Sequence, residues 1–169
     1  QSCYNDLPDN EMKDCFEVLK GELDRRERNI LNFGAIHNDA HPRNILQNGQ
    51  VLTLIDFDRC CYHYFVQDIA NAIYSEYSRI GFHSGHKSAL IEMRELFLIP
   101  FIQAYLAAHP LPKVDIYEVE IFLLYRQFVM FSIFQREINE AAPDYLKVFR
   151  QRIMTRAPFL PFNIESLLF

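Results

Sequence analysis

The chain has 169 residues, and half of them are hydrophobic, with 15 Phe, 9 Tyr and no Trp. This length is sufficient for one domain with a substantial core. The net charge of −5 excludes the basic surface that nucleic-acid binding requires. No apolar run approaches the roughly 20 residues of a membrane-spanning helix, and the first residues lack a secretory signal pattern. The four cysteines form no Cys-x-x-Cys pair, so we expect free thiols and a cytoplasmic location. From the lack of a long apolar run we also expect no membrane partner.

The first predicted element is an amphipathic helix over residues 9–31. Apolar side chains recur along it at helical spacing, at Met12, Phe16, Leu19, Leu23 and Ile30. Asp9 or Asn10 is suited to the N-cap, because its side chain can accept a hydrogen bond from a backbone N–H of the first turn. We therefore expect a helix with one buried and one solvated face at this end of the chain.

A short β-hairpin is predicted next, around the turn signal Asn48-Gly49. Segments 44–46 and 51–55 flank this turn, and their β-branched and apolar residues favour strands. Antiparallel pairing of these strands would bring Asn44 back beside Asp56. Two residues that are distant in sequence thereby become candidates for a single metal site.

The rest of the chain has a helical pattern. Helices are predicted from about residue 66 to a stop at Gly81, over 90–105 with a kink near Pro100, over 115–139 and over 145–154. The expected apolar face of the 90–105 helix consists of Leu90, Met93, Phe97, Phe101, Ala104 and Tyr105. The 115–139 segment is apolar on nearly every side, as expected of a central buried helix. The predicted fold class is therefore α+β and mostly α, with one small β-hairpin.

Two short segments at the ends of this hairpin carry the chemistry. Residues 37–44 read His-Asn-Asp-Ala-His-Pro-Arg-Asn, and residues 54–58 read Leu-Ile-Asp-Phe-Asp. Phosphoryl transfer needs a carboxylate to orient the attacking hydroxyl and oxygen ligands to hold Mg²⁺ on the nucleotide phosphates. Asp39 followed five residues later by Asn44 reproduces the base-to-amide spacing of a kinase catalytic loop, and Asp56 with Phe57 reproduces the start of its metal-binding turn.

With His41 in place of the lysine of protein kinases, the pattern resembles the aminoglycoside phosphotransferase/choline kinase superfamily. The pattern of that family is His-Gly-Asp-x-His-x-x-Asn followed by Ile-Asp-Phe. The resemblance implies that residues 1–169 form a single domain, the C-terminal catalytic lobe of a protein-kinase-like fold, and the N-terminal nucleotide lobe is absent. The implied activity is transfer of the γ-phosphoryl group of ATP or GTP to a hydroxyl of a small molecule, such as an aminoglycoside or an amino alcohol.

The resemblance also implies roles for individual residues. Asp39 is the expected base, and Asn44 and Asp56 are the expected Mg²⁺ ligands that hold the nucleotide phosphates. His41 is expected either as a donor near the transferred phosphate or as a structural histidine of the loop. Asp58 is either an additional ligand or an exposed charge.

Three further residues are expected to shape the loop. His37 resembles a residue that braces the loop and does not react. By the same resemblance, Asp68 accepts hydrogen bonds from the loop backbone, and the alternative is an ordinary aspartate at a helix N-terminus. Asn38 replaces the family glycine, and asparagine is the least costly substitute if this position requires a positive φ.

The main alternative is a non-catalytic, kinase-like binding domain, for which Asn38 and the absent nucleotide lobe are the arguments. In the catalytic interpretation, the chain folds by itself but is inactive without the other lobe. An exposed apolar patch beside the hairpin is then expected where that lobe would sit, and the same surface would allow a homodimer.

Overall fold

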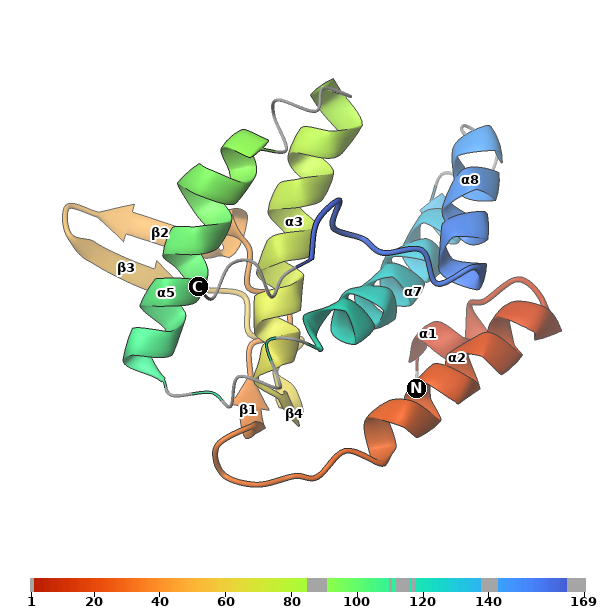
Figure 1. Cartoon of the computed structure of the whole chain (residues 1–169), viewed down its shortest axis with the longest axis horizontal. Coiled ribbons are helices and arrows are strands. Elements are labelled where there is room, and N and C mark those ends of the chain that lie inside the picture. The colour runs from red at the N-terminus through yellow and green to blue at the C-terminus, as the bar shows by residue number, and fades with distance from the viewer. Residues whose placement is uncertain are drawn as a thin grey trace. The chain divides into compact units, whose positions relative to one another are not determined.

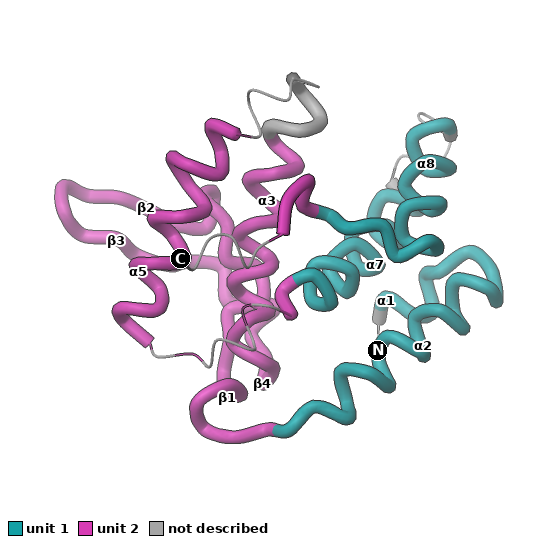
Figure 2. The backbone as a smooth tube through the Cα atoms, in the orientation of Figure 1, with its two compact units in different colours: residues 1–27, 120–159 teal, residues 28–119, 160–169 magenta. Residues whose placement is uncertain are grey.

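Figure 1 shows the computed structural model of the chain, which describes residues 2–84, 91–109, 111, 116, 118–137 and 143–163. The chain divides into two compact units: unit 1 contains residues 1–27 and 120–159, and unit 2 contains residues 28–119 and 160–169 (Figure 2). Within the described residues, helices predominate and the strands form two small antiparallel sheets, which confirms the predicted mostly helical class. The assignment of the chain to a single C-terminal lobe stays a prediction.

Unit 1 is built from helices. Their bounds are Ser2–Asn5 (α1), Asn10–Asp24 (α2), Val119–Glu137 (α7) and Pro143–Met154 (α8). Helix α7 carries buried side chains on all sides, including Phe122, Leu124 and Phe128. The predicted central helix is therefore confirmed. Residues 115, 117, 138 and 139 of the predicted range lie outside the described ones. Aromatic rings pack this core edge to face, with centroids 5.4 Å apart for Phe16 and Phe128.

Helix α2 begins as predicted and ends earlier than predicted. The Asp9 side chain caps it by accepting a hydrogen bond of 2.9 Å from the backbone N–H of Met12. The helix stops at Asp24, short of the predicted residue 31, and Ile30 is 88% exposed, so its placement on the buried face was wrong. Further along the predicted range, the side chain of Asn29 accepts from the backbone N–H of Leu31, so this part of the chain forms a local turn in place of a helix.

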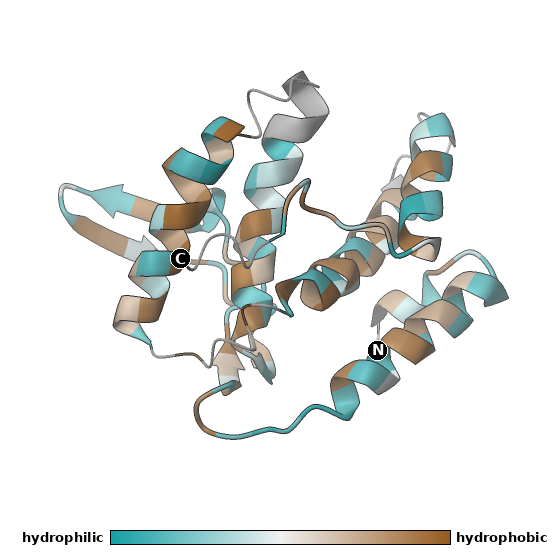
Figure 3. Cartoon of the chain, viewed as in Figure 1, coloured by the Kyte–Doolittle hydropathy of each residue, from teal (hydrophilic) through white to brown (hydrophobic). Residues whose placement is uncertain are grey.

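Unit 2 contains two strand pairs that belong to one interrupted hairpin. The strands are Phe33–Ile36 (β1), Ile45–Asn48 (β2), Val51–Leu54 (β3) and Cys61–Tyr64 (β4). The inner pair, β2 with β3, is the hairpin that the Asn48-Gly49 signal predicts, and Gly49 has the positive φ of 60° that such a turn requires. The outer pair, β1 with β4, was not predicted. Figure 3 shows hydrophobic residues along β3, although every residue of the inner pair is exposed.

The helices of unit 2 differ in detail from the prediction. Helix α3 spans Val66–Ser84 and passes through Gly81, so the predicted stop at this residue was wrong. A glycine inside a helix costs only about 1 kcal/mol relative to alanine, which the packing of a long helix can offset. No helix in the described ranges combines the length and the apolar character needed to cross a membrane.

The segment before Pro100 contains a π-helical turn over Arg94–Leu98 (η2), followed by an α-helix over Ile99–Ala108 (α5). The α-helical pattern is thus interrupted next to the proline, which has no N–H to continue it. Met93, Leu98 and Ile102 are the buried residues here. Of the predicted apolar face, Leu90 lies outside the described residues, and only Met93 is buried among Met93, Phe97, Phe101, Ala104 and Tyr105. The π turn adds a residue to the repeat and so changes which side chains face inward.

Candidate active site

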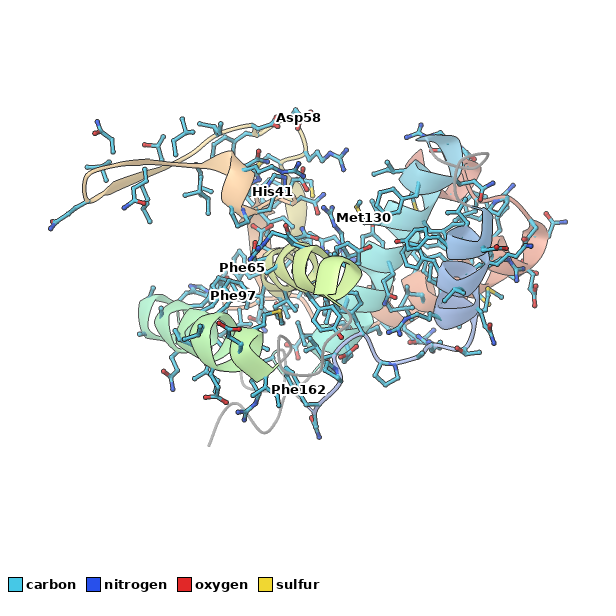
Figure 4. The ribbon with its side chains drawn as sticks, turned by 90° about the horizontal axis from the view of Figure 1, so that it is seen from above. His41, Asp58, Phe65, Phe97, Met130 and Phe162 are labelled. Atoms are coloured by element: carbon cyan, nitrogen blue, oxygen red, sulfur yellow. The ribbon has the colours of Figure 1, made fainter. Side chains whose placement is uncertain are left out.

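The two predicted functional segments lie opposite each other inside the interrupted hairpin. Residues 37–44 connect β1 to β2, and residues 55–60 connect β3 to β4. Ile36 pairs with Cys61 at one end of these segments, and Ile45 pairs with Leu54 at the other. Both segments are therefore held at both ends by antiparallel pairing. Figure 4 shows His41 and Asp58, one from each segment, at the base of the β2–β3 hairpin.

Asp68, in the first turn of α3, holds the start of the 37–44 segment. Its Oδ2 accepts the backbone N–H of His37 at 2.8 Å, and its Oδ1 accepts that of Asn38 at 2.7 Å. A carboxylate offers two acceptor oxygens, so it can satisfy two successive N–H groups at once. The predicted scaffold role of Asp68 is confirmed.

Asn38 and Asp56 both adopt left-handed backbone conformations. Their φ angles are 62° and 66°, respectively. Asparagine and aspartate are the non-glycine residues that reach this region at least cost. The condition stated for Asn38 from the sequence therefore holds: the position has a positive φ, and asparagine adopts the conformation that glycine would otherwise supply.

His37 connects the two segments. Its Nε2–H donates to the backbone carbonyl of Ile55 at 2.8 Å, and its ring lies 4.6 Å from that of Phe57, centroid to centroid. The imidazole is 5% exposed, and its Nδ1 is buried without a hydrogen-bond partner among the described residues. A ring used in this way braces the segments, which supports the structural role predicted for it.

Asp39 lies close to two basic side chains. Its Oδ2 is 3.8 Å from Nε2 of His41 and 4.0 Å from Nε of Arg59. Both separations are longer than a hydrogen bond, so these are electrostatic contacts, and the one to His41 is attractive only when the imidazole is protonated. The sequence predicted Asp39 and His41 as residues of one loop and made no prediction of this contact. It gave no signal for Arg59, which approaches Asp39 only because the 55–60 segment folds back over the 37–44 segment.

Asn44 links Asp39 to the segment that carries Asp56. It ends a 3₁₀ turn over Pro42–Asn44 (η1) and is 7% exposed. Its Nδ2 donates to the backbone carbonyl of Asp39 at 3.1 Å, and its own carbonyl accepts the N–H of Ile55 at 3.0 Å. The Oδ1 atom remains as an acceptor, and Asp56, the next residue after Ile55, is exposed. The structure thus brings Asp39, His41 and Asn44 together, and Asp56 directly follows the residue whose N–H pairs with Asn44.

A neighbouring thiol is unsuited to nucleophilic chemistry. Cys61 follows the 55–60 segment, and burial raises the pKa of its thiol, with smaller contributions from Cys60 and Asp68 in the same direction. The reactive form of cysteine is the thiolate, and a thiol with a raised pKa stays protonated at neutral pH.

Asp58 is exposed in the 55–60 segment, and the choice between a ligand and a solvated charge stays open.

Comparisons with known proteins agree with these observations. A model of the phosphotransferase enzyme family (APH) matches residues 3–112. Amicoumacin kinase of Bacillus subtilis (strain 168) is 25% identical over an alignment of 156 residues, and the match covers 89% of this chain and 46% of that protein. Probable choline kinase 2 of Arabidopsis thaliana is 26% identical over an alignment of 154 residues, and the match covers 80% of this chain and 43% of that protein. The chain therefore spans less than half the length of these curated relatives.

The fold also resembles that of a solved kinase. The structure of amicoumacin kinase hAmiN in complex with AMP-PNP, Ca²⁺ and Ami has a TM-score of 0.80 to this chain, at 20% sequence identity, and the match covers 95% of this chain and 49% of that one. At this identity the likeness shows a kinase-like fold and no more. The match to the family model shows more than the fold, because the matched residues 3–112 include both segments of the candidate site. The chain belongs to the phosphotransferase enzyme family.

Proposed function

We propose that this chain is the catalytic part of a small-molecule kinase, which transfers the γ-phosphoryl group of ATP or GTP to a hydroxyl of a small molecule. Membership of the phosphotransferase family and two relatives named as kinases support this chemistry. A structural neighbour solved with AMP-PNP and Ca²⁺ supports a nucleotide and a divalent cation as ligands of this proposed kinase. The acceptor class that we propose, an aminoglycoside, an amino alcohol or a similar metabolite, rests on the family resemblance.

The observation that carries this proposal is the position of Asn44. The side-chain amide of Asn44 donates a hydrogen bond to the backbone carbonyl of Asp39. The backbone carbonyl of Asn44 accepts one from the N–H of Ile55, the residue before Asp56. A kinase needs a base and its metal ligands in a fixed relation, because positioning provides most of its rate acceleration. These hydrogen bonds hold Asn44 to Asp39 and to the residue before Asp56, which supports the proposed grouping of the three functional residues.

In this proposal Asp39 accepts the hydrogen bond of the acceptor hydroxyl. The hydroxyl oxygen then forms a bond to the γ-phosphorus as the bond to the β-phosphate oxygen breaks, and the hydroxyl proton passes to Asp39. His41, 3.8 Å from Asp39, is proposed as a donor to the transferred phosphoryl group. The products are the phosphorylated acceptor and a nucleoside diphosphate.

The donor set also fits a magnesium ion. Asn44 uses its amide nitrogen internally, which leaves an amide oxygen, and Asp56 provides a carboxylate on an exposed segment. Mg²⁺ prefers such oxygen ligands and completes its shell with water and phosphate oxygens. Asn44 and Asp56 would therefore hold the ion, and when bound it would offset the negative charge of the nucleotide phosphates.

The non-catalytic alternative has lost part of its support. Asn38 was the sequence argument for a degenerate site, yet its φ of 62° has the sign that the family glycine would supply. What remains of that alternative is that the chain spans less than half of its relatives. We propose that the nucleotide lobe belongs to a longer protein and that this chain by itself is inactive.

The surface of the inner hairpin suits such a missing lobe. The exposed apolar side chains of this hairpin and of the segment that follows it, which we call the hairpin patch, are Ile45, Leu46, Val51, Leu52, Leu54 and Phe57. Several large apolar side chains exposed on one short hairpin are typical of an interaction site in a soluble protein. We propose that the nucleotide lobe covers this patch, and a homodimer is the alternative occupant.

Replacement of Asp39 by Asn in the longest polypeptide that contains this chain tests the proposed function. The change preserves shape and removes the proton acceptor, so kcat should fall by about 10²–10⁴-fold, while nucleotide binding changes little. Asp14→Asn is the matched control, because it removes the same charge from an exposed position of α2. Phosphorylation by the Asp39 variant within about twofold of the unmodified protein would contradict the role of base.

A further inference from the structure

Asn71, on the second turn of α3, forms part of a row of three amides, of which Gln67 and Asn71 are buried and Asn38 is half-buried. Asn71 is 1% exposed, and its Oδ1 accepts a hydrogen bond of 2.9 Å from Nε2 of Gln67. Its own Nδ2 donates to Oδ1 of Asn38 at 3.4 Å. We call Gln67, Asn71 and Asn38 the amide row. Gln67 and Asn71 donate in the same direction, toward Asn38, which precedes Asp39 and accepts the last bond.

The row makes α3 a two-point support for Asn38. Asp68 holds its backbone, with Oδ1 2.7 Å from the N–H, and Asn71 holds its side chain. Residues three positions apart lie on the same face of a helix, so both contacts come from one surface of α3. The backbone and the side chain of Asn38 are thus both fixed by the same rigid element.

This support acts where the backbone is least free to relax. Asn38 has a φ of 62°, and an L-residue in this region is less stable than glycine would be, even when it is asparagine. A glycine adopts this conformation without help. A residue with a side chain benefits from a partner that is satisfied only in the left-handed conformation, because that partner then selects it.

We propose that Asn71 is a positioning residue for Asp39. By holding the side chain of Asn38, it keeps the left-handed conformation that directs the following residue, Asp39, toward His41. The support itself rests on the hydrogen bonds of the amide row. Its catalytic consequence rests on the proposed phosphoryl transfer.

Loss of one member of the amide row should also lower the stability of the fold. Removing the Asn71 amide would leave Nε2 of Gln67 and Oδ1 of Asn38 without these partners, and Oε1 of Gln67 already has no partner in the part of the chain that the structure describes. Buried amides with few alternatives are sensitive to the loss of one member. A variant therefore has to separate this general loss from the specific effect on Asn38.

A double-mutant cycle makes this separation. Asn71→Ala, Asn38→Gly and their combination are compared by thermal unfolding of the 169-residue chain. Asn71→Ala should lower Tm by several degrees alone and by clearly less in combination with Asn38→Gly, because glycine needs no support. The loss at Gln67 occurs in both backgrounds and cancels. Equal losses of Tm in the two backgrounds would overturn the proposed support.

The catalytic part is tested in the longer polypeptide. Asn71→Ala should lower kcat about tenfold and leave KM for the nucleotide within about twofold, and in the Asn38→Gly background it should change kcat by less than about twofold. Asn38→Ala, which lacks both the amide and the conformational freedom, should be less active than Asn38→Gly. A rise in KM with kcat unchanged, or equal activity of the two Asn38 variants, would overturn the positioning role. If the Asp39→Asn test shows no kinase activity to lose, the proposed function fails, and the Tm cycle still decides whether the support exists.

Discussion

Asp68 offers the sharpest test of how the candidate site is held. In Asp68→Asn the side chain keeps its size but exchanges one acceptor oxygen for an NH₂ group, so one of the two N–H groups, of His37 or Asn38, loses its acceptor. An unsatisfied donor costs about 1–3 kcal/mol, and Asp68 is only partly buried, so we expect a loss of about 1–2 kcal/mol in the free energy of unfolding. Asp68→Ala removes both acceptors and should cost about twice as much.

Urea unfolding of the chain at neutral pH, followed by circular dichroism, measures this loss. It should appear as a lower midpoint with an unchanged m-value, and as a fall in Tm of about 2–8 °C for a chain of this size. Asp58→Asn is the matched control, because it makes the same chemical change at an exposed position of unit 2, where substitutions alter stability by less than about 0.5 kcal/mol. Coincident unfolding curves for the Asp68 and Asp58 variants would refute the two-bond support of the loop.

Two further predictions concern stability. Asp9→Ala should destabilise the chain by about 1 kcal/mol through the lost cap of α2, whereas Asp9→Asn retains the cap and loses only the ion pair with Arg150, 3.1 Å away. The hydrogen bond from Met12 and the charge of Arg150 lower the pKa of Asp9, so the carboxylate stabilises the fold above about pH 4. The difference between the native chain and the Asn variant in urea unfolding should therefore be present at about pH 6 and be lost as the pH falls through the lowered pKa of Asp9. A difference that does not change with pH would contradict it. In the hairpin patch, Val51→Thr combined with Leu52→Thr should leave the free energy of unfolding within about 0.5 kcal/mol, because these side chains are 64% and 65% exposed, and should reduce self-association in light scattering. A large loss of stability would show that the patch is part of the core.

Local signals in the sequence predicted the local structure well. The Asn48-Gly49 turn and the Asp9 cap are each decided by a few neighbouring residues, and both are confirmed. The end of α2 was missed because the apolar spacing continues past the point where Asn29 forms its own turn. The outer strand β4 was missed because Cys61–Tyr64 has no clear alternation of apolar and polar residues, and its partner β1 lies far away in sequence.

In the candidate site too, the features that local spacing decides were predicted, and the contacts that depend on tertiary structure were not. The spacing of Asp39, Asn44 and Asp56 identified a phosphotransferase, and the family match confirms that identification, while the roles of these residues stay predictions. The contacts of Arg59 with Asp39 and of Asn71 with Asn38 could not be predicted from spacing. They depend on how the 55–60 segment and α3 fold onto the loop, which is a property of tertiary structure.

The interrupted hairpin also determines when the candidate site can form. Every contact described for it lies between β1 and the second turn of α3, and the strands of the inner pair, β2 and β3, are neighbours in the chain. Contacts between residues that are close in sequence form quickly, because little loop entropy is lost when they close. A ribosome adds only about 5–20 residues per second, so this region has time to fold before α7 and α8 are synthesised. The chemical centre is therefore a contiguous module, and substitutions in α7 or α8 should change the lifetime of the folded chain without delaying the assembly of the site.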